Sequence, residues 1–173
     1  DLQDDGRSRN WDDDRRNADL DAEGVAAEVV FPNTVPPFFP TGVVIAPAPS
    51  PEEFPKRLAG IRAHNRWLAD FVAAVPDRRC GQAQIFLNDV DEAVKDVRWC
   101  KDHGINGVLL PGSSPDTPWI EALSSPAYDP LWKFLEENEI PVNAHGGTGS
   151  PDYGKYAATP LLLISEVPFY SQR

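Results

Sequence analysis

Cysteine and histidine are scarce in this chain, with two and three residues respectively among 173. Cys80 stands beside a predicted turn and Cys100 within a helical pattern, and neither has the short spacing of a metal-binding pair. The first residues are charged and contain no apolar signal region. We therefore expect two reduced thiols with structural roles, which argues against a fold held together by a disulfide.

Long hydrophobic runs are also absent. No apolar stretch approaches the roughly 20 residues that a membrane-spanning helix needs. The net charge is −11, and Lys and Arg form no patch or stripe along the sequence. Such a chain is poorly suited to neutralising phosphates, and an anionic membrane surface would repel it. These absences argue against nucleic-acid and membrane partners and favour a cytoplasmic protein.

Three familiar ligand-binding motifs are missing as well. No GxGxxG follows a predicted strand, so a dinucleotide-binding domain has little support. No phosphate-binding P-loop is present. Because GxSxG is absent too, the chain lacks the nucleophile elbow of serine hydrolases.

The chain does contain a regular alternation of apolar strands and amphipathic helices. Strands are predicted at residues 25–31, 81–87, 107–110 and 140–145. Helices are predicted at residues 11–23, 51–75, 89–103, 131–138 and, from a weaker pattern, 159–173. This alternation predicts a single α/β domain over residues 1–173, built on a parallel sheet with right-handed crossovers.

Short local signals mark where the predicted helices begin and end. Ser50 and Glu53 form a capping box, with Pro51 at the first helical position. Asp129 stands before a proline and is a predicted N-cap. Gly24 follows the first predicted helix as a C-cap.

Two loops are rich in proline, of which the chain has 18 residues. They cover residues 32–55 and 111–130, and both contain aromatic side chains that indicate ordered loops. Asn33 lies in the first loop, directly after a predicted strand. Because ligands bind at the C-terminal ends of parallel strands, Asn33 is a candidate for a polar contact to a substrate.

His145 is the most informative residue of the chain. It ends the predicted strand 140–145 and is followed by Gly146 and Gly147. At that end of a strand an imidazole nitrogen can bind a metal, and glycines let the backbone pass close to a bound group. Two interpretations remain open from the position alone: a metal ligand, or a core histidine whose hydrogen bonds are satisfied within the fold.

The other two histidines have more ordinary interpretations. His103 precedes the glycine that ends a predicted helix, where the helix dipole favours a surface histidine. His64 lies in the middle of the longest predicted helix, between Arg62 and Arg66. That cluster could reach into a site, but a solvated or interhelical role is the favoured interpretation.

Three segments together resemble a known family. The first is residues 20–32 (LDAEGVAAEVVFP), the second is residues 64–70 (HNRWLAD), and the third combines residues 128–132 (YDPLW) with 141–147 (PVNAHGG). By their order and spacing the chain resembles the amidohydrolase-related family, in the branch of aminocarboxymuconate semialdehyde decarboxylase and the resorcylate-type decarboxylases. The resemblance covers nearly all of the chain after residue 10.

The resemblance implies a TIM-type (β/α) barrel with one divalent metal, usually zinc. In the family the metal ligands are a His-x-His pair after the first strand, a histidine after the fifth and an aspartate after the eighth. A further histidine after the sixth strand acts as acid and base. His145 matches the fifth-strand ligand by position, so the four predicted strands would be about the second to the fifth of a partial barrel. The implied activity is that of a metal-dependent hydrolase or non-oxidative decarboxylase for a small carboxylated or cyclic substrate.

The chain departs from the family pattern in several places. No His-x-His is present, no strand is predicted before Val25, and the later histidine and aspartate are missing. A catalytic zinc needs about three protein ligands, so we expect a central fragment of a longer enzyme that is inactive and metal-poor when isolated. The alternative is a half-barrel that acts as a binding or assembly module. Its exposed edge strands would be covered in a homo-oligomer or by the missing parts of the barrel.

Overall fold

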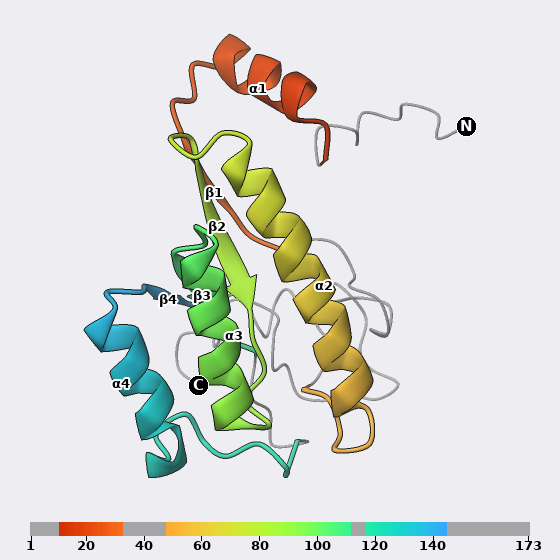
Figure 1. Cartoon of the computed structure of the whole chain (residues 1–173), viewed down its shortest axis with the longest axis vertical. Helices are drawn as coiled ribbons and strands as arrows, with labels where there is room; N and C mark the ends of the chain where they lie inside the picture. Colours follow the sequence, from red (N-terminus) through yellow and green to blue (C-terminus); the bar gives the residue numbers. More distant parts are fainter. Residues whose placement is uncertain (1–10, 33–47, 112–116, 145–173) are drawn as a thin grey trace, which may run out of the picture.

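A computed structural model of the chain describes residues 11–32, 48–111 and 117–144. Within them a 4-stranded sheet has the order β1-β2-β3-β4, and every neighbouring pair is parallel (Figure 1). The strands are β1 (Glu28–Val30), β2 (Arg79–Gln84), β3 (Gly107–Leu109) and β4 (Val142–Asn143). The predicted α/β class, the order of the strands and their parallel pairing are confirmed.

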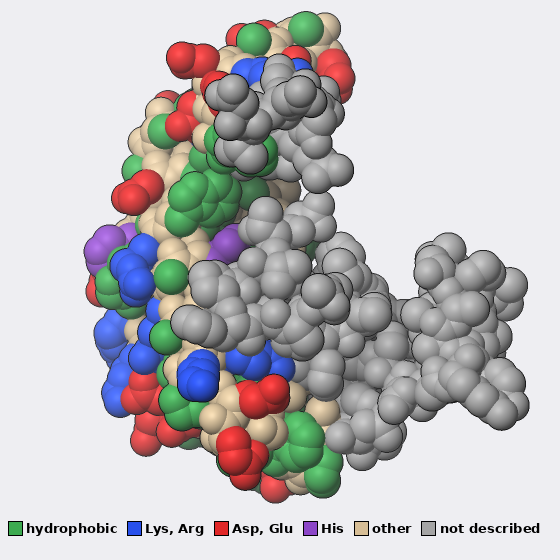
Figure 2. Space-filling view, turned by 90° about the vertical axis from the view of Figure 1, so that its right-hand side faces the viewer, with side chains coloured by type: hydrophobic (Ala, Val, Ile, Leu, Met, Phe, Trp, Pro, Cys, Tyr) green, Lys and Arg blue, Asp and Glu red, His purple; other side chains and the backbone are tan. Residues whose placement is uncertain are grey.

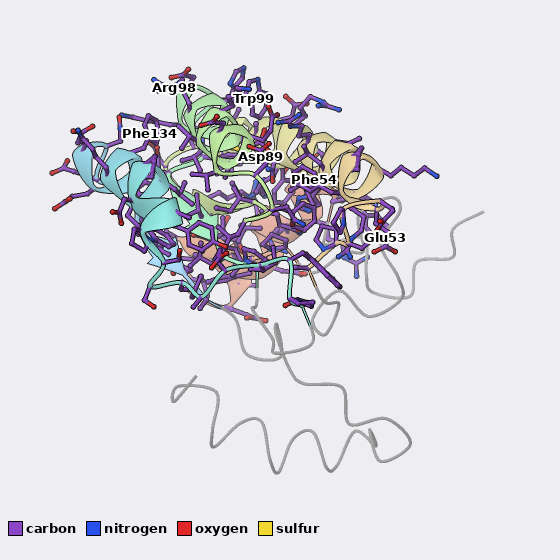
Figure 3. All side chains as sticks on the ribbon, turned by 90° about the horizontal axis from the view of Figure 1, so that it is seen from below. Glu53, Phe54, Asp89, Arg98, Trp99 and Phe134 are labelled. Carbon is purple, nitrogen blue, oxygen red and sulfur yellow. The ribbon has the colours of Figure 1, made fainter. Side chains whose placement is uncertain are left out.

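Three helices follow the strands and lie together on one side of the sheet (Figure 1, Figure 3). They are α2 (Phe54–Ala73), α3 (Val90–Asp102) and α4 (Asp129–Glu137), the last preceded by a short 3-10 helix, η3 (Pro126–Tyr128). Figure 3 shows Arg98 of α3 beside Phe134 of α4, and the Arg98 guanidinium carbon lies 4.6 Å from the centroid of that ring. Cation–π contact therefore adds to the packing of neighbouring helices.

The hydrophobic core fills the space between the helices and the sheet. Ala83 of β2, Ile85 directly after it and Val108 of β3 are buried in it together with side chains from all three helices. Gly81 faces α2 so closely that an added Cβ would stand 2.9 Å from the nearest methyl carbon of Val72. The close approach of α2 thus requires glycine at this position, and burial of each large apolar side chain contributes about 1.5–3 kcal/mol.

The predicted helix ends are confirmed in part. Ser50 and Glu53 exchange two hydrogen bonds, each 3.3 Å from nitrogen to oxygen, as a capping box requires. The box closes a turn ahead of the helix, however, because α2 begins only at Phe54, so Pro51 is not its first residue. Gly24 has a φ of 70° after α1, which confirms the predicted C-cap.

One predicted cap is wrong. Asp129 lies in the first turn of α4, because the 3-10 helix before it leaves Tyr128 at the N-cap position. The predicted strands also run shorter than expected, since regular pairing of β1 with β2 covers only three positions. The helix predicted at residues 159–173 lies outside the described residues.

Helix α1 (Asp13–Ala22) lies across the N-terminal end of the sheet (Figure 1) and buries none of its residues. Charged contacts attach it. Arg16 donates to both carboxylate oxygens of Glu28, at 2.7 and 2.6 Å. Burial alone would raise the pKa of Glu28, but the hydrogen bonds and charges of Arg16 and Arg79 outweigh it and lower that pKa. Glu28 is therefore an ionised, paired carboxylate.

Arg79 of β2 is the centre of this attachment, with a fully buried side chain. Its guanidinium bonds the Asp13 carboxylate, the Phe71 carbonyl at 2.8 Å and the Glu28 carboxylate at 3.3 Å. The guanidinium also lies 3.8 Å from the centroid of the Phe71 ring. Arg79 thus joins α1, β1 and α2 at the N-terminal end of the sheet.

The two edge strands carry exposed apolar side chains. Val29 of β1 is 56% exposed and Val142 of β4 is 45% exposed. Among the described residues neither strand has a pairing partner on its outer side. The helices in this part of the chain include none that is both long and apolar enough to cross a membrane.

Candidate functional site

All four strands run in the same direction, so their C-terminal ends meet at one edge of the sheet. They end at Val30, Gln84, Leu109 and Asn143. Figure 3 views the molecule from this end, where the helix starts at Phe54 and Asp89 are labelled. In parallel α/β folds ligands bind at this edge, which makes it the first place to look for a site.

Both residues predicted to act in a site fall outside the described residues. Asn33 follows the end of β1 by three positions, and His145 follows the end of β4 by two. Their assignments as substrate contact and metal ligand remain predictions.

The described residues do place two glutamines on the sheet face that points away from the helices. Side chains alternate along a strand, and Ala83 and Ile85 belong to the helix-covered core. Gln82 and Gln84 therefore point to the opposite face. We call this the inner face and define it by Gln82, Gln84, and their neighbours Leu109 and Asn143.

Both the oxygen and the nitrogen of the Gln82 side-chain amide have hydrogen-bond partners. Its Oε1 accepts a hydrogen bond of 2.6 Å from Nδ2 of Asn143, two strands away. Its Nε2 lies 3.5 Å from the sulfur of Cys80. The side chain reaches across β3 because Gly107 has no side chain, and a Cβ there would stand 2.2 Å from Oε1. Gln82 is a structural cross-link between β2 and β4.

The backbone of Gln84 is fixed by Asn65 of α2. The Asn65 side chain donates to the Gln84 carbonyl at 2.8 Å and accepts from the Gln84 amide at 3.0 Å. Pairing of β1 with β2 stops at Val30 and Gly81, so within the described residues no part of β1 lies beside these backbone groups. Asn65 is 2% exposed and takes the place of that strand.

Within residues 11–32, 48–111 and 117–144, several buried polar side-chain atoms have no hydrogen-bond partner. They include Nε2 of Gln84, Nδ1 of His64 and Oδ1 of Asn88, while the Asn88 amide nitrogen donates to the Pro49 carbonyl at 2.8 Å. His64 is the neighbour of Asn65, and burial lowers its pKa despite an opposing hydrogen bond from Asn65. His64 is therefore neutral near pH 7. Of the solvated or interhelical role favoured from the sequence, the solvated alternative is wrong because the side chain is buried. Together these groups offer donors and acceptors for recognising a polar ligand.

Sequence reasoning missed Gln84 and Asn65. The signal was present in β2, where glutamines flank Ala83 within a short strand between turns. A polar side chain at alternate positions of such a strand indicates an inner face lined by amides. Asn65 carried no such signal, because its role depends on where β1 ends.

The residues described do not make a metal centre by themselves. Within the parts of the chain that the structure describes, no three His, Cys, Asp or Glu side chains come together to hold a metal. Cys80 and Cys100 are both free thiols, as predicted. Burial, aided by the charge of Asp96, raises the pKa of Cys100 to about 12, so it stays protonated and is a poor ligand.

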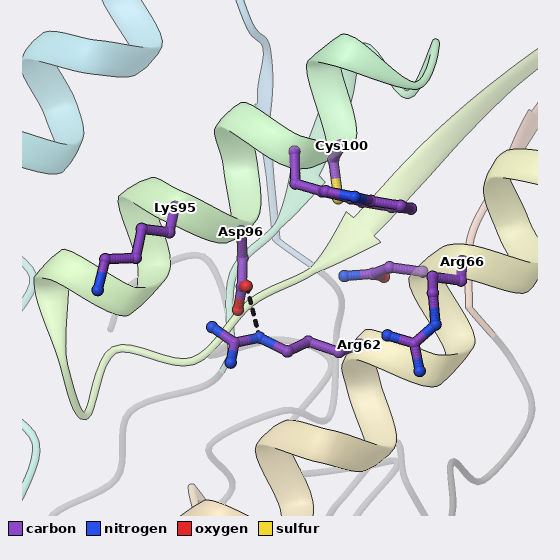
Figure 4. Close-up of a pocket in the computed structure, with 7 residues that line it drawn as sticks. Arg62, Arg66, Lys95, Asp96 and Cys100 are labelled. Carbon is purple, nitrogen blue, oxygen red and sulfur yellow. Dashed lines mark hydrogen bonds and ion pairs between the residues drawn. The ribbon is translucent and has the colours of Figure 1, made fainter.

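A groove of about 260 Å³ lies between α2 and α3, on the helix side of the sheet (Figure 4). Arg62 of α2 crosses it to bond Asp96 at 2.7 Å and Glu92 at 2.5 Å. Hydrogen bonds from Lys95 and Arg62 lower the pKa of Glu92 to about 2. In Figure 2 most of the visible basic side chains gather on the left and lower part of the described surface, next to acidic ones. Charged side chains of both signs line the groove and join the two helices, and Asn65, which bonds the Gln84 backbone, lines it as well.

His103 has the surface role that its position predicted. It is exposed at the C-cap of α3 and stacks on Trp99, with ring centroids 3.9 Å apart. One ring nitrogen lies 2.7 Å from the Trp99 carbonyl oxygen. His103 therefore completes a helix end and is not part of the strand-end region.

Known proteins share this architecture. A family model described as "Amidohydrolase" matches residues 5–167. The gamma-resorcylate decarboxylase of Rhodococcus jostii (strain RHA1) is 32% identical over 128 residues, which make up 67% of this chain and 38% of that protein.

Solved structures agree with the family match. The 2,6-dihydroxybenzoate decarboxylase from Rhizobium is similar with a TM-score of 0.64 and 26% identity, over 94% of this chain and 45% of that one. A 5-carboxyvanillate decarboxylase from Novosphingobium aromaticivorans was solved with manganese and 4-hydroxy-3-methoxy-5-nitrobenzoic acid. It is similar with a TM-score of 0.60 and 25% identity, over 88% of this chain and 38% of that one.

The chain spans less than half the length of these relatives. The strands of the chain are consecutive and parallel, and β1, β2 and β3 are each followed by a helix on the same face of the sheet. Those barrel enzymes have the same arrangement. The family match covers most of the chain. The chain therefore belongs to the amidohydrolase family, and its four strands are part of a TIM-type (β/α) barrel, about the second to the fifth strand.

Proposed function

We propose that the chain forms part of the barrel of a metal-dependent decarboxylase that acts on a small aromatic carboxylate carrying hydroxyl groups. The observation that carries the proposal is the similarity to 2,6-dihydroxybenzoate decarboxylase, which extends over 94% of the chain at 26% identity. That enzyme was also solved with 2,6-dihydroxybenzoate. A carboxylate with neighbouring hydroxyls matches a strand edge supplied with amide and imidazole groups.

The proposed metal ligand within this chain is His145, and Asn33 is the proposed polar contact to the substrate. Two considerations support His145. It follows β4 at the edge where ligands of parallel α/β folds bind, and related decarboxylases at 25% identity contain manganese. The bound ion would be a divalent metal, manganese by likeness to those relatives or zinc by the family's usual preference. It would supply a positive charge for the oxygen atoms of the substrate.

The activity is tested by following release of carbon dioxide from 2,6-dihydroxybenzoate by the natural full-length protein, with and without added Mn²⁺ or Zn²⁺. Metal-dependent release supports the proposal. Cleavage of an amide or ester substrate without any carbon dioxide release would instead place the protein among the hydrolases of the family.

The metal ligand is tested by replacing His145 with alanine and measuring bound metal by mass spectrometry. The matched control is His103→Ala, which removes an exposed histidine stacked on Trp99. We expect His145→Ala to lose most of the bound metal and His103→Ala to retain it. Equal metal content in the two variants would exclude His145 as a ligand.

An assembly module is the second candidate, favoured by the exposed valines on β1 and β4. A half-exposed apolar side chain on an edge strand invites pairing with another chain. In this case the protein would bind a second copy through Val29 or Val142. Light scattering separates the candidates, because Val29→Lys would then reduce the mass of the complex. A compact monomer that is unchanged by this substitution argues against the module.

A further inference from the structure

The two glutamines of β2 form a natural pair for comparison. They lie two residues apart on the same face of the same strand, and both are at least nine-tenths buried, at 2% exposed for Gln82 and 8% for Gln84. Gln82 uses its amide to reach Asn143 and Cys80. In the part of the chain that the structure describes, the Gln84 amide nitrogen has no hydrogen-bond partner. Side-chain chemistry and burial are thus matched, and only the hydrogen bonding differs.

An unpaired buried amide is costly, because the group gives up its bonds to water and gains none in return. Such a group persists where something other than stability requires it. Gln84 is the last residue of β2, so its amide lies at the C-terminal edge of the sheet. In a (β/α) barrel this is the edge where substrates bind.

The position of Gln84 is also fixed in a way that suits recognition. Asn65 holds both backbone groups of Gln84, at 2.8 and 3.0 Å, and is itself buried. The side chain therefore starts from a backbone that cannot easily rotate. A donor on such a preorganised backbone loses little freedom when it bonds a ligand.

We infer that Gln84 is a substrate-binding residue, whose Nε2–H donates a hydrogen bond to an acceptor oxygen of a small anionic aromatic ligand. The inference rests on the proposed function for the class of ligand. It adds a binding residue from β2, separate from Asn33 and His145. An Nε2 amide can only donate, so the atom it recognises is a carboxylate or phenolic oxygen and not an N–H or hydroxyl hydrogen.

The test measures the affinity of the natural full-length protein for 2,6-dihydroxybenzoate by calorimetry, in the presence of Mn²⁺. Gln84→Met removes the donor and keeps the volume, and Gln82→Met is the matched control. We expect Gln84→Met to weaken binding about 10- to 100-fold, as for loss of one hydrogen bond to a charged oxygen, without lowering the midpoint of unfolding. Gln82→Met should lower the midpoint, because Asn143 loses its partner, and should change affinity less than about threefold.

A third variant sharpens the result. Gln84→Glu places a negative charge where the donor stood, so binding of the anion should fall further than in Gln84→Met. Affinity that is unchanged in both Gln84 variants overturns the inference. Equal loss of affinity in Gln82→Met and Gln84→Met overturns it too, because the effect would then be structural.

Failure of the proposed function has a different signature. If the protein binds the ligand and Gln84→Met weakens binding, but no carbon dioxide is released, the decarboxylase proposal fails and the inference stands. If carbon dioxide is released at the same rate and with the same KM by the Gln84 variants, the function stands and the inference fails. If the unaltered protein binds no such ligand, both are overturned.

Discussion

The two ends of the sheet differ in how fully their buried polar side chains are hydrogen-bonded. At the N-terminal end Arg79 is fully buried and bonds a carbonyl and the carboxylates of α1 and β1. At the C-terminal end Gln84 is also buried, yet among the described residues its amide nitrogen has no hydrogen-bond partner. In (β/α) barrels the N-terminal face serves stability and the C-terminal face serves chemistry. The difference in hydrogen bonding follows that division within a single strand, because both residues belong to β2.

The largest expected effect comes from the N-terminal end. Arg79→Leu would remove the guanidinium that Asp13, Glu28 and the Phe71 carbonyl share; because Glu28 keeps Arg16 and Asp13 is partly exposed, we expect a cost near the lower end of that for a broken buried ion pair, about 3 kcal/mol. We expect this loss in the free energy of unfolding from urea denaturation, together with release of α1. Lys133→Ala is the control, because its pair with Glu137 is exposed on both sides and should matter little. A stability of Arg79→Leu equal to that of the control would remove the proposed anchoring role.

The Asn65 contact gives the next largest effect. Asn65→Leu keeps the size of the side chain but leaves the amide and carbonyl of Gln84 without partners, at about 1–3 kcal/mol for each buried group. Arg66→Leu, on the exposed side of the same helix, is the control for changes in α2. Hydrogen exchange of the Gln84 amide should rise in the first variant only. Unchanged exchange would mean that another group protects this amide.

A substitution at Gly107 tests the hydrogen bond between Gln82 and Asn143. Gly107→Ala would place a methyl group against the Gln82 amide and displace it from Asn143, at a cost of about 1–3 kcal/mol for overpacking. The double variant with Gln82→Ala makes room for the new methyl. We therefore expect the two losses of stability to be less than additive in a double-mutant cycle. Strict additivity would show that the two side chains do not meet.

The smallest effect is a pH dependence at the C-terminal end. Burial lowers the pKa of His64 below the ordinary value of 6.5, so the folded state holds this proton less tightly than the unfolded state. The contribution to stability is therefore complete above about pH 6.5 and is lost as the pH falls. Between pH 7 and 5 the free energy of unfolding should fall less in His64→Gln than in the unaltered protein. Parallel curves would mean that His64 titrates alike in both states.

The order of elements could be predicted from the sequence because each follows from a local period. Short apolar runs bounded by turn residues predicted the strands near Val29, Gln84, Leu109 and Val142, and apolar spacings of three and four predicted the helices between them. The lengths of the strands could not be predicted, because pairing ends where a neighbour leaves the sheet. That neighbour for β2 is β1, which stops at Val30.

The candidate site was accessible from the sequence only in part. Asn33 and His145 were chosen by their places after predicted strands, and they lie outside the described residues. Gln84 and Asn65 depend on contacts between α2 and β2, which no local pattern reveals. The buried state of His64 also depends on packing, since the stripe that it occupies on α2 is mixed in polarity. A position after a predicted strand can be recognised from local sequence. A role that depends on burial by distant segments cannot, whatever the chemical type of the residue.

The Asn65 contact has a consequence for how this protein can change over evolution. The Asn65 side chain of α2 bonds both the amide and the carbonyl of Gln84, the last residue of β2. At this point β2 therefore does not depend on β1 for its backbone hydrogen bonds. The length of the chain between β1 and α2 can then change without unpairing β2 at this point. Substrate preference could diversify through that segment while the framework beneath it keeps its geometry.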